Sequence, residues 1–476
     1  MQILPSGQPP PSGHQRQPGL ALTPFRGLRY APDRVSGLAE VTSPPYDVIA
    51  HDTEGQLLAA DPHNVVRLIL PRPDARHAGG EYQEAARLLQ DWQADGILLP
   101  DAGPALYVYE QRERPGGHSP GAPGADGTAA APAGAGRVIQ RGLIGALRLA
   151  PAGNPAVLPH ENVLPGPVAG RRELMEATGA NLEPIFLLYD GGGAGAASGL
   201  PDEVAERDEP LLTVDTGDGI RHRLWAVTDP ARHAAVAADL AGRQALIADG
   251  HHRYAAYLEV QSREREAGGG PGPWDSGLAL LVDSDAYPPR LGAIHRMIAG
   301  LPEAEAAARA KDAFTVRAVP GLSSPELAAA GPGATAALGA AAAALAGASR
   351  NGPAFLLAGE GDVHLLTDPD PDQLAAAMPG RSARWRELPA AVMQELLLAR
   401  LWGIRDDDPS VQIHHDLATA VRAAGEPPAG TAVICPPLSA DRVREVAARG
   451  ERVPRKSTSF GPKPRTGLVL RTFGLG

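Results

Sequence analysis

Residues 245–253 read ALIADGHHR, and this stretch decides the fold that we expect around it. The four apolar residues Ala245–Ala248 are typical of a short buried strand. Asp249 and Gly250 then indicate a turn, and Tyr254–Ala267 has helical character. The stretch therefore predicts a strand that passes through a tight turn into a helix.

A turn of this composition favours an anionic, phosphate-bearing ligand. The first N–H groups of a helix lack partners inside it, and the helix dipole adds partial positive charge there. Gly250 lets a ligand approach the backbone, and Arg253 offers a two-pronged donor for oxygen atoms. His251 and His252 can donate hydrogen bonds or carry a proton, but neighbours on a helix do not face one metal ion together. The alternative is structural, with Asp249 capping the helix.

The segments on either side predict an α+β protein in two halves, 23–300 and 301–476. In the first half we expect strands at 65–70, 105–111, 137–149, 184–189, 222–228 and 277–282, and helices at 80–95 and 171–178. In the second half we expect helices at 303–310, 371–377, 389–401 and 439–449, strands at 314–319, 431–435 and 466–472, and a hairpin over 354–367.

Segments rich in Pro and Gly interrupt this pattern. Residues 1–22 have the composition of a disordered arm. Residues 115–136 are of low complexity and predict a disordered insertion between the two strands of a hairpin. Two shorter flexible breaks are expected at 191–199 and 267–273.

Composition excludes several classes of protein. The net charge of -11 argues against broad nucleic-acid binding, which usually needs a basic face. The single cysteine, Cys435, excludes a disulfide framework and a thiolate metal cluster within the chain. The first residues lack the apolar core of a signal peptide, and no apolar run is long enough to span a membrane. We therefore expect a soluble, cytoplasmic protein.

Two loops carry acidic residues that suit catalysis. In TSPPYDV, residues 42–48, two prolines make the turn rigid, so Asp47 is a candidate metal ligand or general base. His160 and Glu161 are adjacent and could act as an acid/base pair or as metal ligands. The alternatives are an ordinary turn aspartate and a solvated loop.

The segment 452–465, RVPRKSTSFGPKPR, is basic and contains no acidic residue. It holds two of only three lysines in the chain, which suggests that Lys456 and Lys463 are kept for their compact ammonium groups. Together with Arg455, Ser457 and Thr458, they suit a polyphosphate or an acidic metabolite. The segment is not a P-loop, because the glycine pattern that precedes the lysine of a P-loop is missing. The alternative is a solvated basic tail. Two further candidates, His295-Arg296 and His414-His415-Asp416, are better explained as structural.

Several separated segments together resemble the family called domain of unknown function 1015, often labelled ParB-like. They are residues 24–30, 43–49 (SPPYDVI), 160–161 followed by 181–189, 248–254 (ADGHHRY), 295–296 and 453–470. This chain departs from the family pattern at Val163, where threonine is common, at Val453, where methionine is usual, and at the insertion over 115–136.

The resemblance implies a ParB/sulfiredoxin-like fold for the first half. That fold includes CTP-binding partition proteins, ATP-using sulfiredoxins and free-serine kinases, and the DGHHR wording is most similar to the serine kinases. No helix-turn-helix segment is evident, and the motif holds histidine where a sulfiredoxin has its catalytic cysteine. Both departures favour phosphotransfer to a small molecule.

The resulting hypothesis is a phosphotransferase that uses ATP or ADP with Mg²⁺ and acts on a small hydroxyl metabolite such as free serine. Its predicted nucleotide-binding residues are Gly250, His251, Arg253, Arg455, Lys456, Ser457, Thr458 and Lys463. Its predicted catalytic residues are Asp47, His160, Glu161, Asp249 and His252, with Asp47 and Glu161 as Mg²⁺ ligands. This one-site hypothesis requires the segment 452–465 to fold back onto the turn at 249–253.

Three alternatives remain open at this point. The same anion site could serve a phosphatase or other hydrolase, with water as the acceptor. It could also belong to a nucleotide-binding regulator without turnover. The third alternative, a DNA-binding partition factor, is disfavoured by the acidic net charge.

Overall fold

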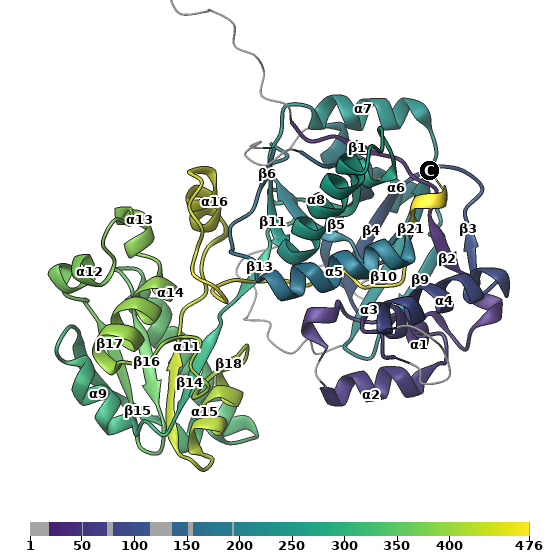
Figure 1. The fold of residues 1–476 in the computed structure, drawn as a ribbon. Helices are drawn as coiled ribbons and strands as arrows, with labels where there is room; N and C mark the ends of the chain where they lie inside the picture. The colour runs from purple at the N-terminus through teal and green to yellow at the C-terminus, as the bar shows by residue number, and fades with distance from the viewer. Residues whose placement is uncertain are drawn as a thin grey trace, which may run out of the picture.

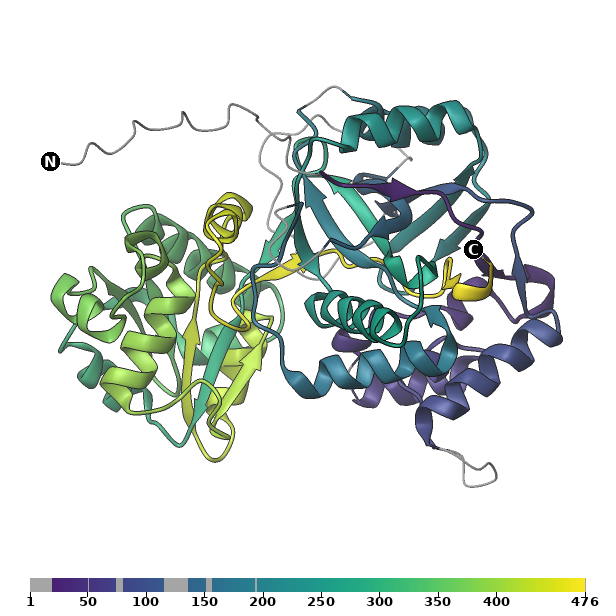
Figure 2. The ribbon, with the colours of Figure 1, turned by 45° about the horizontal axis from the view of Figure 1, so that its top comes forward.

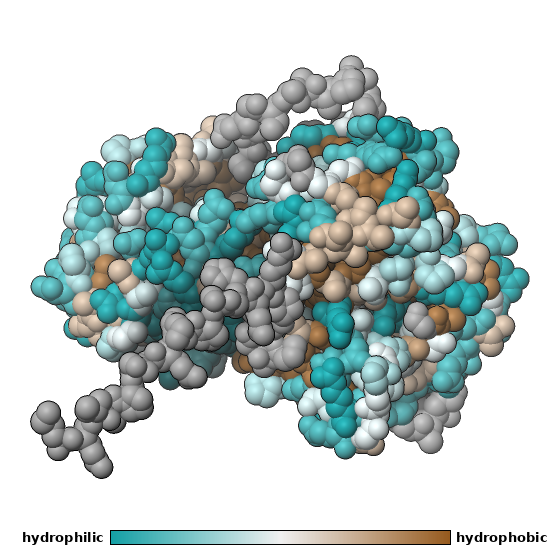
Figure 3. Space-filling view, turned by 90° about the horizontal axis from the view of Figure 1, so that it is seen from above, coloured by the Kyte–Doolittle hydropathy of each residue, from teal (hydrophilic) through white to brown (hydrophobic). Residues whose placement is uncertain are grey.

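The computed structural model describes residues 19–49, 51–73, 80–114, 136–150, 156–192 and 195–475. It shows two α+β lobes side by side, each built around one large mixed or antiparallel sheet (Figures 1 and 2). Hydrophilic residues cover most of the face seen from above, and hydrophobic residues show in smaller patches (Figure 3). Among the helices of these ranges, none combines the length and the apolarity needed to cross a bilayer.

The first lobe is organised by a nine-stranded sheet. Its order is β6-β11-β8-β12-β5-β4-β10-β9, with β1 beside β5. The strands are β1 (Leu22–Thr23), β4 (Leu106–Glu113), β5 (Val138–Arg148), β6 (Val157–Leu158), β8 (Ile185–Tyr189), β9 (Leu212–Asp215), β10 (Ile220–Val227), β11 (Ala245–Asp249) and β12 (Ser276–Asp283). The strands expected from the sequence between 105 and 282 are therefore confirmed. β4 and β5, which flank the expected insertion, pair antiparallel as in a hairpin.

Helices cover this sheet and build the side of the lobe that carries the turn at Gly250. They are α1 (Leu38–Val41), α2 (His51–Ala60), α3 (Val66–Ile69), α4 (Glu81–Ala94), α5 (Pro165–Thr178), α6 (Ala196–Arg207), α7 (Pro230–Leu240) and α8 (His251–Glu266). α5 packs against both α4 and α8. Apolar side chains of α5 and α8, such as Met175 and Tyr257, pack on the sheet in one buried cluster.

Two expectations for this lobe were wrong. Residues 65–70 were predicted as a strand but form the helical turn α3, because Asn64 accepts a hydrogen bond from the Val66 N–H (2.9 Å) and starts the turn. A short apolar run is compatible with a buried helix as well as with a buried strand. Here the run packs against α4 as a helical turn, and this packing is not visible in the local sequence. The expected break at 191–199 is also shorter than predicted, because α6 begins at Ala196.

The expected disordered segments fall mainly outside the described residues. This holds for 1–18 of the arm predicted at 1–22, and for 115–135 of the insertion predicted at 115–136. Gly19 and Leu20 are placed, and their N–H groups donate to the carbonyls of Ala241 and Arg243 (both 3.1 Å). Residues 19–22 of the predicted arm are therefore ordered.

The second lobe has a six-stranded sheet in the order β15-β17-β16-β19-β14-β18. Its strands are β14 (His295–Ala299), β15 (Thr315–Ser323), β16 (Phe355–Ala358), β17 (Asp362–Thr367), β18 (Val411–His414) and β19 (Gly430–Ile434). Its helices are α9 (Glu303–Ala310), α10 (Ser324–Ala328), α11 (Pro332–Ser349), α12 (Pro371–Ala377), α13 (Ala383–Arg386), α14 (Pro389–Ala391), the π-helical segment η4 (Val392–Trp402), α15 (Leu417–Gly425) and α16 (Ala440–Ala448). The predicted hairpin over 354–367 is confirmed as β16 and β17.

The chain crosses between the lobes twice. It enters the second lobe through β13 (Arg290–Gly292) and returns through β20 (Ser459–Gly461), and these two strands pair antiparallel. After β20 the chain runs along the first lobe, with Thr466 bridged to Ser43 and β21 (Arg471–Thr472) paired with β7 (Ala180–Asn181) (Figure 1). The last residues of the predicted second half thus pack on the first lobe, and only part of the strand expected at 466–472 forms.

Candidate functional site

The predicted strand, turn and helix are confirmed around Gly250. β11 ends at Asp249, α8 begins at His251, and Gly250 between them has φ 95°, in the left-handed region. A Cβ atom on Gly250 would lie 3.0 Å from Ile185 Cγ2 and 3.1 Å from Arg253 Nε. The left-handed conformation therefore favours glycine here, and an added Cβ would also press on these two side chains. Asp249 does not cap the helix, because its carboxylate has other partners.

Those partners are two cations, one on each side of Asp249. Arg253, only 2% exposed, donates to the Asp249 carboxylate and to the Pro184 carbonyl (2.5 Å). Lys463 Nζ lies 2.5 Å from Asp249 Oδ1 and donates to Asp47 Oδ2 (2.8 Å). The predicted proximity of the basic segment to the turn is thereby confirmed. The guanidinium of Arg253, expected to hold a ligand, is instead engaged inside the protein.

This network sets the charge state of the groups in it. Burial alone would raise the pKa of the Asp47 carboxyl, but Lys463 and Arg253 hold that pKa below its ordinary value. Burial opposes the charge of Lys463, yet Asp249 and Asp47 raise its pKa. Both side chains are therefore ionised at neutral pH.

The histidines of the turn are fixed by backbone N–H groups. His251 Nε2 accepts from the His160 N–H (3.2 Å), and His252 Nε2 accepts from the Leu164 N–H (3.1 Å). Burial lowers the pKa of both rings; the neighbouring histidines lower that of His251 further, and Asp47 only partly opposes the lowering at His252. Each ring is therefore neutral at pH 7 and carries its proton on Nδ1.

His160 lies behind the turn and not at its surface. Its ring is fully buried, sits edge-on to the His251 ring with centroids 4.4 Å apart, and has Nε2 3.0 Å from Thr458 Oγ1. Burial lowers the pKa of His160 to about 3, so it is neutral. The predicted role of His160 in proton transfer to a substrate is not supported by this position, because the ring is absent from the wall of the cavity.

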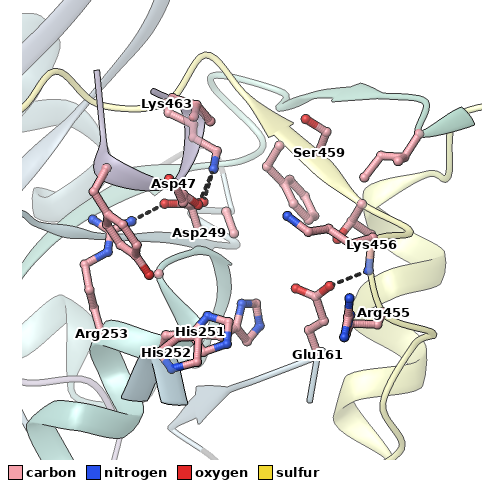
Figure 4. Close-up of a pocket in the computed structure, with 18 of the residues that line it drawn as sticks. Asp47, Glu161, Asp249, His251, His252, Arg253, Arg455, Lys456, Ser459 and Lys463 are labelled. Atoms are coloured by element: carbon pink, nitrogen blue, oxygen red, sulfur yellow. Dashed lines mark hydrogen bonds and ion pairs between the residues drawn. The ribbon is translucent and has the colours of Figure 1, made fainter. Parts of the chain in front are cut away.

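A second cationic pair faces the turn from the basic segment. Lys456 has φ 52°, and its N–H donates to Glu161 Oε1 (2.7 Å). The side chains of Arg455 and Lys456 line the same cavity and have no carboxylate partner within the described residues. Burial raises the pKa of the Glu161 carboxyl, although Lys456 opposes this. Figure 4 shows both cations across the cavity from the start of α8.

These groups surround one cavity of about 560 Å³ between the lobes, a size that suits a small-molecule ligand. Eleven of the predicted residues line it: Asp47, Glu161, Asp249, Gly250, His251, His252, Arg253, Arg455, Lys456, Thr458 and Lys463. His160 and Ser457 do not, and the Ser457 hydroxyl is buried without a partner in the described structure.

The cavity also has an apolar side that the sequence did not predict. Tyr46, Val48, Leu164 and Pro167 line it, and Val48 and Leu164 are unusually exposed for their type. From the second lobe comes His415, which the motif at 414–416 could have indicated. Among the residues that the structure describes, no group of three or more His, Cys, Asp or Glu side chains is arranged to hold a metal ion.

The model of one protein family matches residues 22–121 and 129–391 of this chain. The chain belongs to the family described as "Protein of unknown function (DUF1015)". The matched residues include the turn at Gly250, and the match ends before Arg455 and Lys456. No curated protein matches the chain.

Several solved structures are similar to this DUF1015 chain. A free serine kinase in complex with AMP is 14% identical with a TM-score of 0.32, over 64% of this chain and 83% of that one. A conserved hypothetical protein from Pyrococcus furiosus is 14% identical with a TM-score of 0.30, over 64% and 87%. SbnI with a C-terminal truncation, from Staphylococcus aureus, is 10% identical with a TM-score of 0.29, over 64% and 79%.

Proposed function

We propose that this protein is a nucleotide-dependent phosphotransferase that moves a phosphoryl group from ATP or ADP to the hydroxyl of a small metabolite. Free serine is the first acceptor to test, because the wording of the DGHHR motif is most similar to that of free-serine kinases. A small anionic substrate with a hydroxyl group fits a cavity whose walls combine cations, carboxylates and apolar side chains.

One observation carries the proposal. The start of α8, whose first-turn N–H groups have no partner within the helix and no side-chain cap in the described structure, faces Arg455 and Lys456 across the cavity. Arg253 and Lys463 are neutralised by Asp249 and Asp47, whereas Arg455 and Lys456 have no carboxylate partner within the described residues and are available for a ligand. A helix start and two free cations around one space are what a polyphosphate chain needs.

The carboxylates suit the transfer step. The oxygen of the acceptor hydroxyl would attack the terminal phosphorus, its proton would pass to Glu161, and the bond from phosphorus to the nucleotide oxygen would break. Burial raises the pKa of Glu161, which makes it a stronger base once it is deprotonated. Arg455 and Lys456 would stabilise the charge on the transferred group and on the departing nucleotide.

Asp47 is the carboxylate best placed to meet a nucleotide-bound Mg²⁺. The pKa of Asp47 is lowered, because Lys463 and Arg253 outweigh the effect of burial, and only Oδ2 is engaged by Lys463 in the described structure. Protein sites for Mg²⁺ use one or two carboxylates together with phosphate oxygens, so Asp47 with or without Glu161 would suffice. Such an ion would neutralise phosphate charge during transfer.

A nucleotide-binding regulator is the second candidate. It is favoured by the position of the cavity, whose lining comes from the first lobe, from His415 of the second lobe and from the segment that joins them. A ligand bound there would contact both lobes and could favour one arrangement of them.

A product assay separates these functions. The protein is incubated with ATP or ADP, Mg²⁺ and either serine or a panel of small hydroxy compounds, and phosphorylated products are followed by ³¹P NMR. A new phosphate ester that is lost in Glu161→Gln supports the phosphotransferase. Free phosphate without any acceptor would indicate a hydrolase, and binding without turnover would indicate a regulator.

A further inference from the structure

Arg296 of β14 lies buried behind the segment that carries the two free cations. Its side chain is fully buried, with Nε donating to Asp406 Oδ1 (2.6 Å) and Nη2 to Asp406 Oδ2 (3.3 Å). Nη2 also donates to the carbonyls of Lys456 (3.1 Å) and Arg455 (3.4 Å). A buried guanidinium needs such partners, and here two of them are carbonyls of the basic segment.

The backbone at Arg455 and Lys456 is held from both lobes. Glu161 of the first lobe accepts the Lys456 N–H, and Gln394 of the second lobe donates to the Arg455 carbonyl (2.8 Å). Lys456 takes the left-handed conformation, with φ 52°, which a lysine adopts only when its surroundings impose it. With the N–H and the two carbonyls bound, the side chains of both residues are directed into the cavity.

We propose that Arg296, held by Asp406 and assisted by Gln394, is a positioning residue that presents Arg455 and Lys456 to the anionic part of the ligand. The inference rests on the proposed function, because it concerns the same site. Two long cations on a loop bind a polyphosphate well only if their backbone is fixed beforehand; otherwise, binding must order the loop as well. The second lobe would thus contribute to affinity through residues that do not touch the ligand.

Calorimetric titration with inorganic pyrophosphate tests this inference on the full chain. Gln394→Met removes only the hydrogen bond to the Arg455 carbonyl, and we expect it to weaken binding about fivefold. Arg296→Lys keeps a positive charge beside Asp406 but cannot serve the carboxylate and both carbonyls at once, so we expect about tenfold weaker binding. Gln412→Met is the matched control, since Gln412 is exposed on β18 and makes no side-chain hydrogen bond within the described residues.

Repeating Gln394→Met in a variant that lacks both cations shows whether its effect on binding depends on Arg455 and Lys456. In the variant Arg455→Ala/Lys456→Ala, we expect Gln394→Met to cause no further loss of pyrophosphate affinity, because the cations that it positions are gone. An equal loss in both backgrounds would overturn the inference, since it would indicate a general effect on the lobe.

The remaining outcomes distinguish the inference from the proposed function. If Gln394→Met and Arg296→Lys bind pyrophosphate like the wild type while Arg455→Ala/Lys456→Ala binds it weakly, the positioning role is wrong and the proposed site stands. If Arg455→Ala/Lys456→Ala also binds like the wild type, the proposed site itself is wrong, and the inference fails with it.

Discussion

At the scale of single residues, the four cations of the site differ in whether a carboxylate pairs with them. Arg253 and Lys463 are engaged by Asp249 and Asp47, whereas Arg455 and Lys456 have no carboxylate partner in the described part of the chain. The sequence indicated all four as ligand-binding cations. It could not show which of them are neutralised, because Lys463 and Asp47 are 416 residues apart and meet only in the folded chain.

Removal of Lys463 should destabilise the protein in a pH-dependent way. In Lys463→Met, Asp47 and Asp249 lose their shared cation, and we expect the free energy of unfolding at pH 7 to fall by about 2 kcal/mol. The folded-state pKa of Asp47 is lowered, so its contribution is present above the unfolded pKa of about 4 and is lost as the pH falls further. Urea unfolding at pH 7 and at about pH 3 checks this, and an equal difference at both values would contradict it.

His160 should make the protein sensitive to mild acid. Its folded pKa of about 3 lies below the unfolded value of about 6.5, so the unfolded state binds the proton more readily between these values. Stability should therefore fall as the pH falls from 7 to 5, by up to about 2 kcal/mol from this residue. In His160→Phe we expect the fall to be smaller by that amount. An unchanged pH dependence of unfolding would show that the ring is not buried in its neutral form.

At the scale of elements, the ALIADGHHR stretch was interpreted correctly as a strand, a turn and a helix, because each local signal agreed with the others. The strand predicted at 65–70 was wrong because its pattern was ambiguous and Asn64 starts a helical turn. His160 and Glu161 are neighbours in sequence, yet one is buried and the other lines the cavity. That difference depends on the packing of the segment 453–460, which no local pattern reveals.

The turn itself can be tested by a pair of glycine substitutions. Gly250→Ala places a Cβ against Ile185 and Arg253 at φ 95°, and we expect it to lower stability by about 1–2 kcal/mol and to weaken pyrophosphate binding. Gly199→Ala lies within α6 with no heavy atom within 4 Å of the new Cβ, so it should be neutral or stabilising by up to about 1 kcal/mol. Thermal unfolding of both variants checks this. Equal effects would show that the left-handed turn is not required.

At the scale of the whole molecule, the cavity depends on both lobes and on the segment that returns from the second to the first. The sequence predicted two α+β halves and the proximity of the basic segment to the turn. It did not predict that the chain after β20 would pack along the first lobe, since that requires long-range pairing such as Leu28 with Leu470. The family resemblance to a ParB/sulfiredoxin-like fold remains a prediction for the first lobe.

A ligand in this cavity should protect segments of both lobes together. With pyrophosphate or ATP and Mg²⁺ present, we expect slower amide hydrogen exchange at the start of α8, around Lys456 and around His415. Exchange in α11, none of whose residues lines the cavity, is the internal reference. Protection confined to the first lobe would show that the second lobe takes no part in binding.

The central claim is that Arg455 and Lys456 complete an anion site at the start of α8. Calorimetric titration of pyrophosphate into the wild type, Arg455→Ala/Lys456→Ala and the control Arg449→Ala tests it most directly, because Arg449 is exposed near the end of α16 and forms no ion pair within the described residues. We predict saturable binding by the wild type and the control, and at least about tenfold weaker binding by the double variant, since each charged contact contributes about 1.5 kcal/mol or more. Equal affinity of all three proteins would contradict the claim.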